Sequence, residues 1–318
     1  MTSGLTKITA PPATDTDVVA SMRGITKTYG DVDALSDVTF HIERNKIHGL
    51  LGRNGAGKTT IMSILTGQAI QTDGEATVFG ESPFENANVL RDVCFVKESQ
   101  TYPDDLCVGH VLTAASHLIE HWDAAFAEQL LDDFELPRRR RVKKLSRGMR
   151  SALGVTIGLA SRAPLTLFDE PYLGLDAVAR QLFYDRLLAD YAEHPRTVVL
   201  STHLIDEVAN LLEHVLVVDR GRIVVDDDAD TLRQSAVVVT GPTAAVEGFA
   251  ANGAVLHRET LGTTTRATIR TAGPDVPDHS RLVAAGGTVE PASLQEFVIR
   301  TTSLPHDGTS HTSQESKS

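Results

Sequence analysis

A glycine-rich stretch early in the chain combines residue types that hold phosphate. It reads GRNGAGKTT and covers residues 52–60. Glycines lack side chains, so consecutive backbone N–H groups can turn toward one anion. Lys58 supplies a mobile positive charge for terminal phosphates, and the Thr59 hydroxyl is a ligand for Mg²⁺. The spacing Gly52-x-x-x-x-Gly57-Lys58-Thr59 therefore fits a phosphate-binding P-loop.

Two carboxylates follow an apolar run later in the chain. The run reads LTLFDEP and places Asp169 and Glu170 directly after residues 165–168. Buried strands end at the sheet edge where ligands bind, so both side chains are expected there. Asp169 can hold Mg²⁺, usually through water, and Glu170 can orient or deprotonate an attacking water. An isolated Asp-Glu pair more often opens a solvated loop, but the P-loop in the same chain favours the catalytic interpretation.

A third polar motif, Ser201-Thr202-His203, ends the β-branched run TVVLS. A histidine at this point can reach a γ-phosphate or the water beside Glu170. Alone it is weak, because a histidine at a strand end is more often a polar cap. The three motifs together predict a nucleotide-hydrolysing site, whereas the P-loop alone leaves kinases, GTPases and many ATPases open.

The elements that would position these residues are short β-branched runs alternating with longer helical patterns. We expect strands at 46–51, 165–168 and 197–201, helices at 59–67 and 177–194, and a hairpin formed by 214–219 and 222–225. This alternation predicts a parallel sheet covered on both faces. The acidic run VVDDDAD, residues 224–230, is interpreted as a turn after the hairpin.

Changes in residue composition and pattern along the chain predict several domains and segments. Residues 1–18 are polar and expected to be disordered, as is the tail 304–318. The phosphate-binding part covers 19–236 and contains a helical insertion at about 103–160, where amphipathic patterns occur without a clear strand. Residues 237–303 are expected to form a small α+β domain.

Composition narrows the possible partners. The chain has 318 residues, with 30 Lys and Arg against 42 Asp and Glu, a formal charge of −12. No nucleic-acid partner is expected, since phosphate backbones favour positive surfaces, and the basic run RRRRVKK is interpreted as a solvated or ATP-facing turn.

Two cysteines, Cys94 and Cys107, cannot form a disulfide framework or a four-ligand zinc site. The sequence contains no apolar stretch of about 18 residues and no secretory signal, so we expect a soluble chain that only a partner holds at a membrane.

The motifs, in this order, resemble the ATP-binding cassette of ABC transporters over roughly residues 20–236. LTLFDEP matches the Walker B motif, which implies that Asp169 holds Mg²⁺ and that Glu170 is the catalytic glutamate. Residues 52–60 match the Walker A motif. The nucleotide-binding residues implied there are Gly52, Asn54, Gly55, Ala56, Gly57, Lys58, Thr59 and Thr60.

Further positions carry roles that only the resemblance implies. Tyr29 looks like the aromatic residue that stacks on adenine. LSRGM, residues 145–149, occupies the place of the family signature LSGGQ, and its Ser146 and Gly148 would meet the γ-phosphate held by a second cassette. GLD resembles the D-loop, with Asp176 at the interface, and STH matches the switch-histidine motif with His203.

Two departures from the family pattern stand out. In the signature, Arg147 replaces the first glycine and Met149 the glutamine. In the Q-loop, the family glutamine is replaced by Glu98 at the best-aligned position, with Gln100 two residues on. Glutamate there could still contact Mg²⁺ or water, so Glu98 joins Thr59 and Asp169 as an expected metal ligand, and the choice between Glu98 and Gln100 stays open.

The resemblance implies an α/β fold: a P-loop NTPase cassette with a mixed sheet and a helical subdomain, followed by the small C-terminal α+β domain. It implies an ATPase with ATP and Mg²⁺ as cofactors. Two cassettes, identical or different, would pair and drive a separate transmembrane permease subunit of an exporter, from the cytoplasmic face of the cell membrane. The alternatives are a soluble ABC-type ATPase without a transport role and a weakly hydrolysing regulatory cassette.

Overall fold

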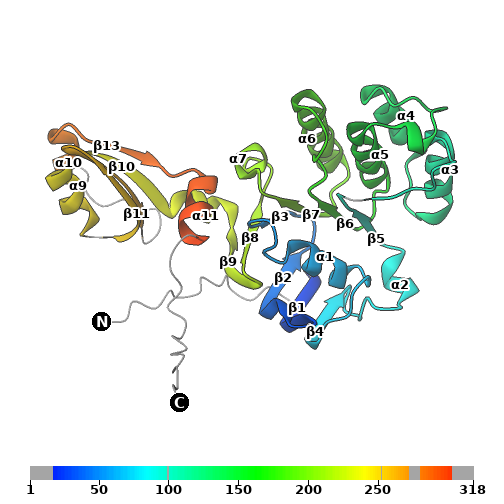
Figure 1. The fold of residues 1–318 in the computed structure, drawn as a ribbon, viewed down its shortest axis with the longest axis horizontal. Helices are drawn as coiled ribbons and strands as arrows, with labels where there is room; N and C mark the ends of the chain where they lie inside the picture. Colours follow the sequence, from blue (N-terminus) through cyan, green and yellow to red (C-terminus); the bar gives the residue numbers. More distant parts are fainter. Residues whose placement is uncertain (1–16, 99, 252, 272–279, 303–318) are drawn as a thin grey trace, which may run out of the picture. The chain divides into compact units, whose positions relative to one another are not determined.

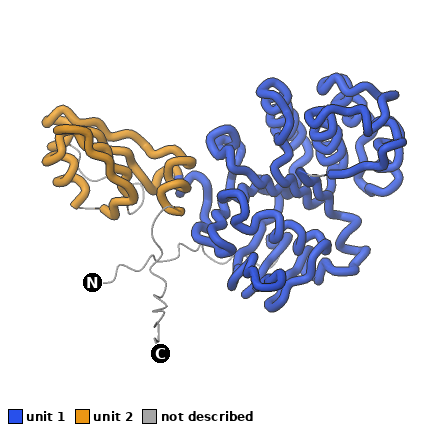
Figure 2. The backbone as a smooth tube through the Cα atoms, in the orientation of Figure 1, with its two compact units in different colours: residues 1–232 blue, residues 233–318 orange. Residues whose placement is uncertain are grey.

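The computed structural model describes residues 17–98, 100–251, 253–271 and 280–302. The chain forms two compact units, residues 1–232 and residues 233–318 (Figure 2). The first described strand begins at Val18, the last residue of the segment expected to be disordered. Residues 1–16 of that segment and the expected tail 304–318 lie outside the described residues.

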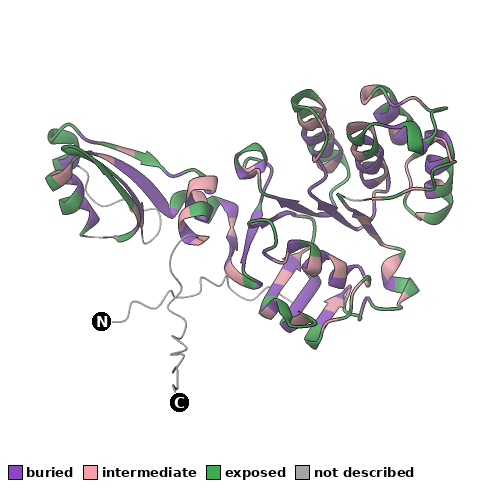
Figure 3. Ribbon diagram, in the orientation of Figure 1, coloured by how far each residue is buried: buried purple, intermediate pink, exposed green. Residues whose placement is uncertain are grey.

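A six-stranded mixed sheet, with strand order β5-β6-β7-β3-β8-β9, runs through the first unit (Figure 1). The strands are β5 (Val93–Val96), β6 (Leu165–Asp169), β7 (Thr197–Thr202), β3 (Ile47–Leu51), β8 (His214–Asp219) and β9 (Arg222–Asp228). The first five are parallel, and β9 pairs antiparallel with β8. β3, β6, β7 and β8 are buried along their whole length, as expected for parallel strands covered on both faces (Figure 3).

A separate antiparallel sheet lies on the side of the six-stranded sheet that carries α1 (Figure 1). Its order is β2-β1-β4, from β1 (Val18–Tyr29), β2 (Val32–Glu43) and β4 (Asp73–Val78). One apolar cluster joins it to α1 (Lys58–Leu65) and to the six-stranded sheet, with Ile25 from β1, Met62 from α1 and Leu167 from β6 among its members. The P-loop, which lies directly before α1, is therefore anchored between two sheets.

Helices follow β5 on the other side of the sheet. They are α3 (Val108–Leu118), α4 (Ala124–Asp133), the 3-10 turn η1 (Val142–Lys144), α5 (Arg147–Ala160) and α6 (Ala177–Glu193). Part of this region has an apolar core of its own, in which Leu112 of α3, Leu131 of α4 and Leu153 of α5 are members. α5 approaches β6 closely, because a Cβ on Gly158 would lie 2.5 Å from a ring carbon of Phe168. This contact places the signature helix directly on the strand that carries Asp169.

The second unit is an α+β sandwich of one sheet and short helices. Its antiparallel sheet has the order β11-β12-β10-β13. The elements are β10 (Ala236–Pro242), α9 (Thr243–Ala250), β11 (Ala254–Leu261), β12 (Thr264–Arg270), α10 (Ser280–Ala284), β13 (Thr288–Pro291) and α11 (Leu294–Thr302). Val239, Phe249 and Ile269 belong to its own apolar core, which makes this unit compact in itself.

Other short helices are α2 (Ala87–Leu90), α7 (Ile205–Val208) and α8 (Ala229–Gln234). The interpretation of residues 224–230 as a turn is wrong, because β9 continues through Asp228 and α8 begins at Ala229. Two of the acidic residues are buried: Asp226 pairs with His214 of β8 at 2.8 Å, and Asp227 has a raised pKa mainly because of burial. Pairing across the hairpin thus keeps an acidic run in a strand.

Candidate functional site

The loop between β3 and α1 requires glycine at two positions. Gly57 has φ of 115°, and a Cβ there would lie 2.7 Å from the side chain of Leu35 and 3.0 Å from the carbonyl of Ala34. At Gly52 a Cβ would lie 2.3 Å from the carbonyl of Val218. A side chain at either position would push the loop away from the strands beside it.

Lys58, at the start of α1, points into this loop. Its Nζ donates to the Gly52 carbonyl at 2.7 Å and to the Arg53 carbonyl at 3.3 Å, and it lies 3.3 Å from Glu170 Oε1. The residue is buried, so its charge is offset by these partners. A triphosphate is a stronger partner for an ammonium group than two carbonyls, which makes this charge available to a bound nucleotide.

Asp169 joins three elements at the end of β6. Its Oδ2 accepts from the Thr59 hydroxyl of α1 at 2.7 Å, and its Oδ1 accepts from the Ser201 hydroxyl of β7 at 2.6 Å. Thr59 and Asp169 together offer the hard oxygen donors that Mg²⁺ prefers. Within the described residues there is no group of three or more His, Cys, Asp or Glu that could hold a metal by itself. The residues present therefore fit an ion that is held partly by protein oxygens and partly by substrate phosphates.

Glu170 follows with a backbone conformation that non-glycine residues rarely adopt. Its φ is 49°, and the residue is buried. Oε1 faces Lys58, whereas Oε2 accepts from the Tyr172 hydroxyl and lies 2.9 Å from His203 Nδ1. Unusual φ values of this kind cluster at functional sites, where the surroundings hold the chain in place.

These groups line one cleft of about 580 Å³. It brings together the predicted residues Asn54, Gly55, Gly57, Lys58, Thr59, Thr60, Glu98, Asp169, Glu170 and His203. Gly52 and Ala56 lie beneath it: Gly52 offers its carbonyl to Lys58, and Ala56 packs in the apolar core. Tyr29 does not line the cleft. It ends β1, is 51% exposed and has Lys27 Nζ 4.7 Å from its ring centre.

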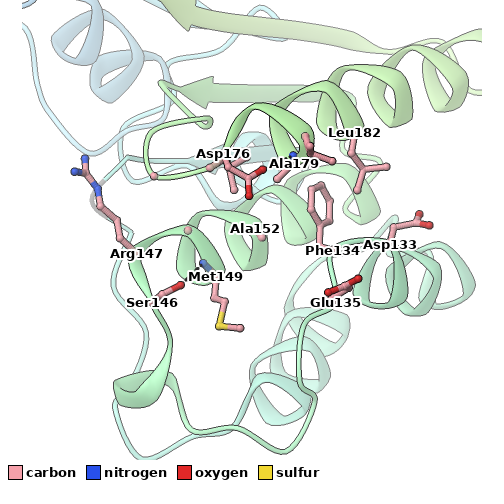
Figure 4. A pocket seen from close by; sticks show the side chains of 14 residues that line it. Asp133, Phe134, Glu135, Ser146, Arg147, Met149, Ala152, Asp176, Ala179 and Leu182 are labelled. Atoms are coloured by element: carbon pink, nitrogen blue, oxygen red, sulfur yellow. Dashed lines mark hydrogen bonds between the residues drawn. The ribbon is translucent and has the colours of Figure 1, made fainter.

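The signature residues line a different pocket of about 610 Å³ (Figure 4). Ser146 and Gly148 lie there with Asp176, and the two pockets share no residue. Ser146 caps α5 by accepting from the Met149 N–H at 3.2 Å, and Asp176 caps α6 by accepting from the Ala179 N–H at 2.9 Å. The structure of one chain therefore keeps the signature and the P-loop at separate places.

Arg147 and Glu98, the two departures from the family pattern, contact each other. A guanidinium nitrogen of Arg147 donates to Glu98 Oε1 at 3.0 Å. Glu98 lines the cleft, while Gln100 lines a neighbouring pocket of about 380 Å³ that Glu98 and Arg147 also border. In Figure 4 the Arg147 side chain extends away from Ser146 and Met149.

Two residues that contact the predicted site residues could not be identified from the sequence. The motif Ser201-Thr202-His203 assigns no role to Ser201, yet the Ser201 hydroxyl donates to Asp169. Tyr172 was not considered, although its hydroxyl contacts both Glu170 and His203. The available signal was an aromatic residue two positions after Glu170, but the contact to His203 joins segments 31 residues apart.

None of the helices in the described part of the chain is long and apolar enough to cross a membrane.

Comparison with known proteins agrees with this geometry. The family model described as ABC transporter matches residues 35–173. The chain is 32% identical over 228 residues to the doxorubicin resistance ATP-binding protein DrrA of Mycobacterium tuberculosis (strain ATCC 25618 / H37Rv), covering 69% of each chain.

Solved cassettes share the fold. The ATP-binding subunit of an ABC transporter superposes with a TM-score of 0.61 at 24% identity, over 68% of this chain and 92% of that one. A dimeric post-hydrolysis cassette, MJ0796 bound to ADP and Pi, gives a TM-score of 0.59 at 22% identity, over 66% of this chain and 98% of that one. The predicted fold class is confirmed: this chain belongs to the family of ABC transporter ATP-binding proteins, and its first unit contains the P-loop ATPase cassette of that family.

Proposed function

We propose that this chain is the Mg·ATP-hydrolysing subunit of an exporter, in which closure of two cassettes drives a separate membrane subunit. Relatives named for doxorubicin resistance, Nod factor export and bacitracin transport support this direction of transport. The observation that carries the hydrolytic part is the single cleft in which Lys58, Glu170 and His203 meet the Thr59–Asp169 pair. Water activation needs a base, a cation and a metal-binding pair within one small space.

Each side chain has a defined task in this proposal. Lys58 leaves the Gly52 carbonyl for the terminal phosphates, which the loop amides surround. Thr59 and Asp169 hold Mg²⁺, which when bound supplies positive charge to the phosphate oxygens. Glu170 accepts the proton of the attacking water through its carboxylate, and His203 Nδ1, 2.9 Å from Oε2, fixes that carboxylate and the space beside it.

The rest of the site comes from a second cassette. Ser146 and Gly148 line a pocket that shares no residue with the P-loop cleft, which supports their acting on a nucleotide other than that of their own chain. We assign them to the γ-phosphate held by a paired cassette, identical or different, and Asp176 to the same interface. Tyr29 is assigned to the adenine and Glu98, rather than Gln100, to the metal side of the cleft. The same proposal places the chain at the cytoplasmic face of a membrane through its partner.

The experiment is the substitution Glu170→Gln in the full-length chain. Removing the base should lower ATP turnover by about 10²–10⁴-fold while ATP stays bound, because the loop, Lys58 and Asp169 are untouched. Size-exclusion chromatography with ATP should then show a trapped dimer. Glu193→Gln, the same change at an exposed position on α6, is the control and should leave turnover unchanged. Normal hydrolysis by Glu170→Gln would remove Glu170 from the mechanism.

A weakly hydrolysing regulatory cassette is the second candidate. The Arg147–Glu98 ion pair favours it, because it ties the signature to a residue of the cleft. Steady-state ATPase activity with the membrane subunit present separates the two candidates, since a regulatory cassette would stay slow there.

A further inference from the structure

The hydroxyl group of Tyr172 lies at the centre of the hydrolytic machinery. Tyr172 follows Glu170 in the loop between β6 and α6, and the residue is buried. Its hydroxyl oxygen contacts Glu170 Oε2, Thr202 Oγ1 at 2.8 Å, and both the backbone N and Nδ1 of His203 at 3.2 Å. One oxygen atom therefore joins the ends of β6 and β7, which are far apart in sequence.

The direction of these hydrogen bonds follows from the chemistry of the groups. A carboxylate can only accept, so the single proton of the phenol points to Glu170. The Thr202 hydroxyl and the His203 N–H then donate to the phenol oxygen. Burial, and next the hydrogen bond to Glu170, raise the pKa of the Tyr172 phenol above its ordinary value, so it stays a donor throughout the neutral range.

The Glu170 carboxylate needs a hydrogen-bond partner that holds it in position. Its backbone is in the left-handed region, and its Oε1 has Lys58 as a neighbour, a cation that a nucleotide would draw away. Oε2 then keeps only Tyr172 and His203. The His203 ring is 37% exposed at the cleft, whereas Tyr172 is 3% exposed and packed in the protein. Tyr172 is thus the more rigid of the two supports.

We propose that Tyr172 is a positioning residue for ATP hydrolysis, whose hydroxyl holds the Glu170 carboxylate and the His203 segment in the arrangement that water activation needs. This inference rests on the proposed function, because it acts through Glu170. Tyr172 contacts the base and the histidine, and it has no part in binding the nucleotide.

The test replaces Tyr172 with phenylalanine, which keeps the buried ring and removes the hydroxyl. In full-length protein with Mg·ATP, kcat should fall about 10- to 100-fold, as expected for loss of a hydrogen bond to a charged group, and the ATP KM should change less than about twofold. Tyr191→Phe is the matched control. Its hydroxyl also binds a carboxylate, Glu213 Oε2 at 2.7 Å, and a carbonyl, that of Asn45 at 2.6 Å, yet neither group lines the cleft. Turnover of this control should be unchanged.

A double-mutant cycle shows whether Tyr172 acts within the network. Thr202→Val removes the hydroxyl that donates to the phenol, so Tyr172→Phe should cost less in that background than in the original chain. A purely structural role would instead raise KM and lower kcat together, or give additive effects, and either result would overturn the inference, as would an unchanged kcat.

The Glu170→Gln variant keeps the two proposals apart. If Glu170→Gln abolishes turnover but Tyr172→Phe does not reduce it, only the role of Tyr172 fails. If Glu170→Gln hydrolyses ATP normally, the proposed function itself fails.

Discussion

The ion pair between Arg147 and Glu98 yields a prediction with a definite sign. Glu98 lines the nucleotide cleft, and Arg147 neutralises it from the first turn of α5 at 3.0 Å. Replacing Arg147 with glycine, the residue of the family signature, leaves the Glu98 charge uncompensated beside the triphosphate. We expect weaker binding of ATP in the absence of Mg²⁺, where Glu98 has no ion to hold, and we expect the second change Glu98→Gln to restore it.

The free energy that this ion pair contributes is small, because solvent screens both charges. The Arg147 and Glu98 side chains are 67% and 47% exposed, so the pair is worth roughly 0.2–1 kcal/mol. That range corresponds to a change of about 1.4- to 5-fold in the dissociation constant of metal-free ATP. Raising the salt concentration to 1 M shortens the screening length to about 3 Å, so the difference between the single and double variants should shrink.

The assay is equilibrium dialysis of ATP, with EDTA present, against the two single variants, the double variant and the original chain. Arg258 and Glu247 of the second unit form a matched control pair, 2.8 Å apart and 44% and 47% exposed. Changing Arg258 to glycine and Glu247 to glutamine should leave the dissociation constant of metal-free ATP unchanged. Metal-free ATP binding by Arg147→Gly that equals binding by the original chain, or a further loss of binding on adding Glu98→Gln, would refute this prediction.

Two further predictions concern stability. Burial, and next the neighbouring His214, lower the pKa of His48 to about 3, below the value of 6.5 in an unfolded chain. Protons therefore bind preferentially to the unfolded state as the pH falls from 6.5 to 3, and the free energy of unfolding should drop by up to about 1.4 kcal/mol per pH unit. The variant His48→Gln should show a smaller drop when urea unfolding is measured between pH 7 and pH 5. Asp190 pairs with the buried Arg196 at 2.5 Å, so Asp190→Ala should cost about 3–5 kcal/mol, against less than about 0.5 kcal/mol for the exposed Asp185→Ala on the same helix.

Runs of apolar and β-branched residues allowed the central strands to be predicted. KIHGLL, LTLF, TVVLS and HVLVVD correspond to β3, β6, β7 and β8 because strands buried on both faces are nearly continuous in hydrophobicity. The sheet of β1, β2 and β4 was not predicted. Polar and charged residues interrupt β1, and register shifts at Ile25 and Lys27 break its alternation. β9 was predicted too short, because the pairing of Asp226 with His214 is invisible in a linear pattern.

The candidate site could also be predicted only in part. Residues within one short motif, such as Lys58 and Thr59 at the start of α1, could be named because their spacing fixes their geometry. The contacts of Tyr172 with His203 and of Arg147 with Glu98 could not be predicted, because they join distant segments and no motif relates the two partners. Such contacts depend on how α5 and the strand ends pack, which is decided by the whole core.

The central claim is that the loop around Lys58 grips a nucleoside triphosphate, and that hydrolysis takes place beside Glu170. The most direct test measures ATP binding by equilibrium dialysis and phosphate release for the original chain and for Lys58→Ala. We predict that the original chain binds and hydrolyses ATP, and that Lys58→Ala binds it more weakly and releases no phosphate above background. Equal binding and equal phosphate release by the two proteins would contradict the account.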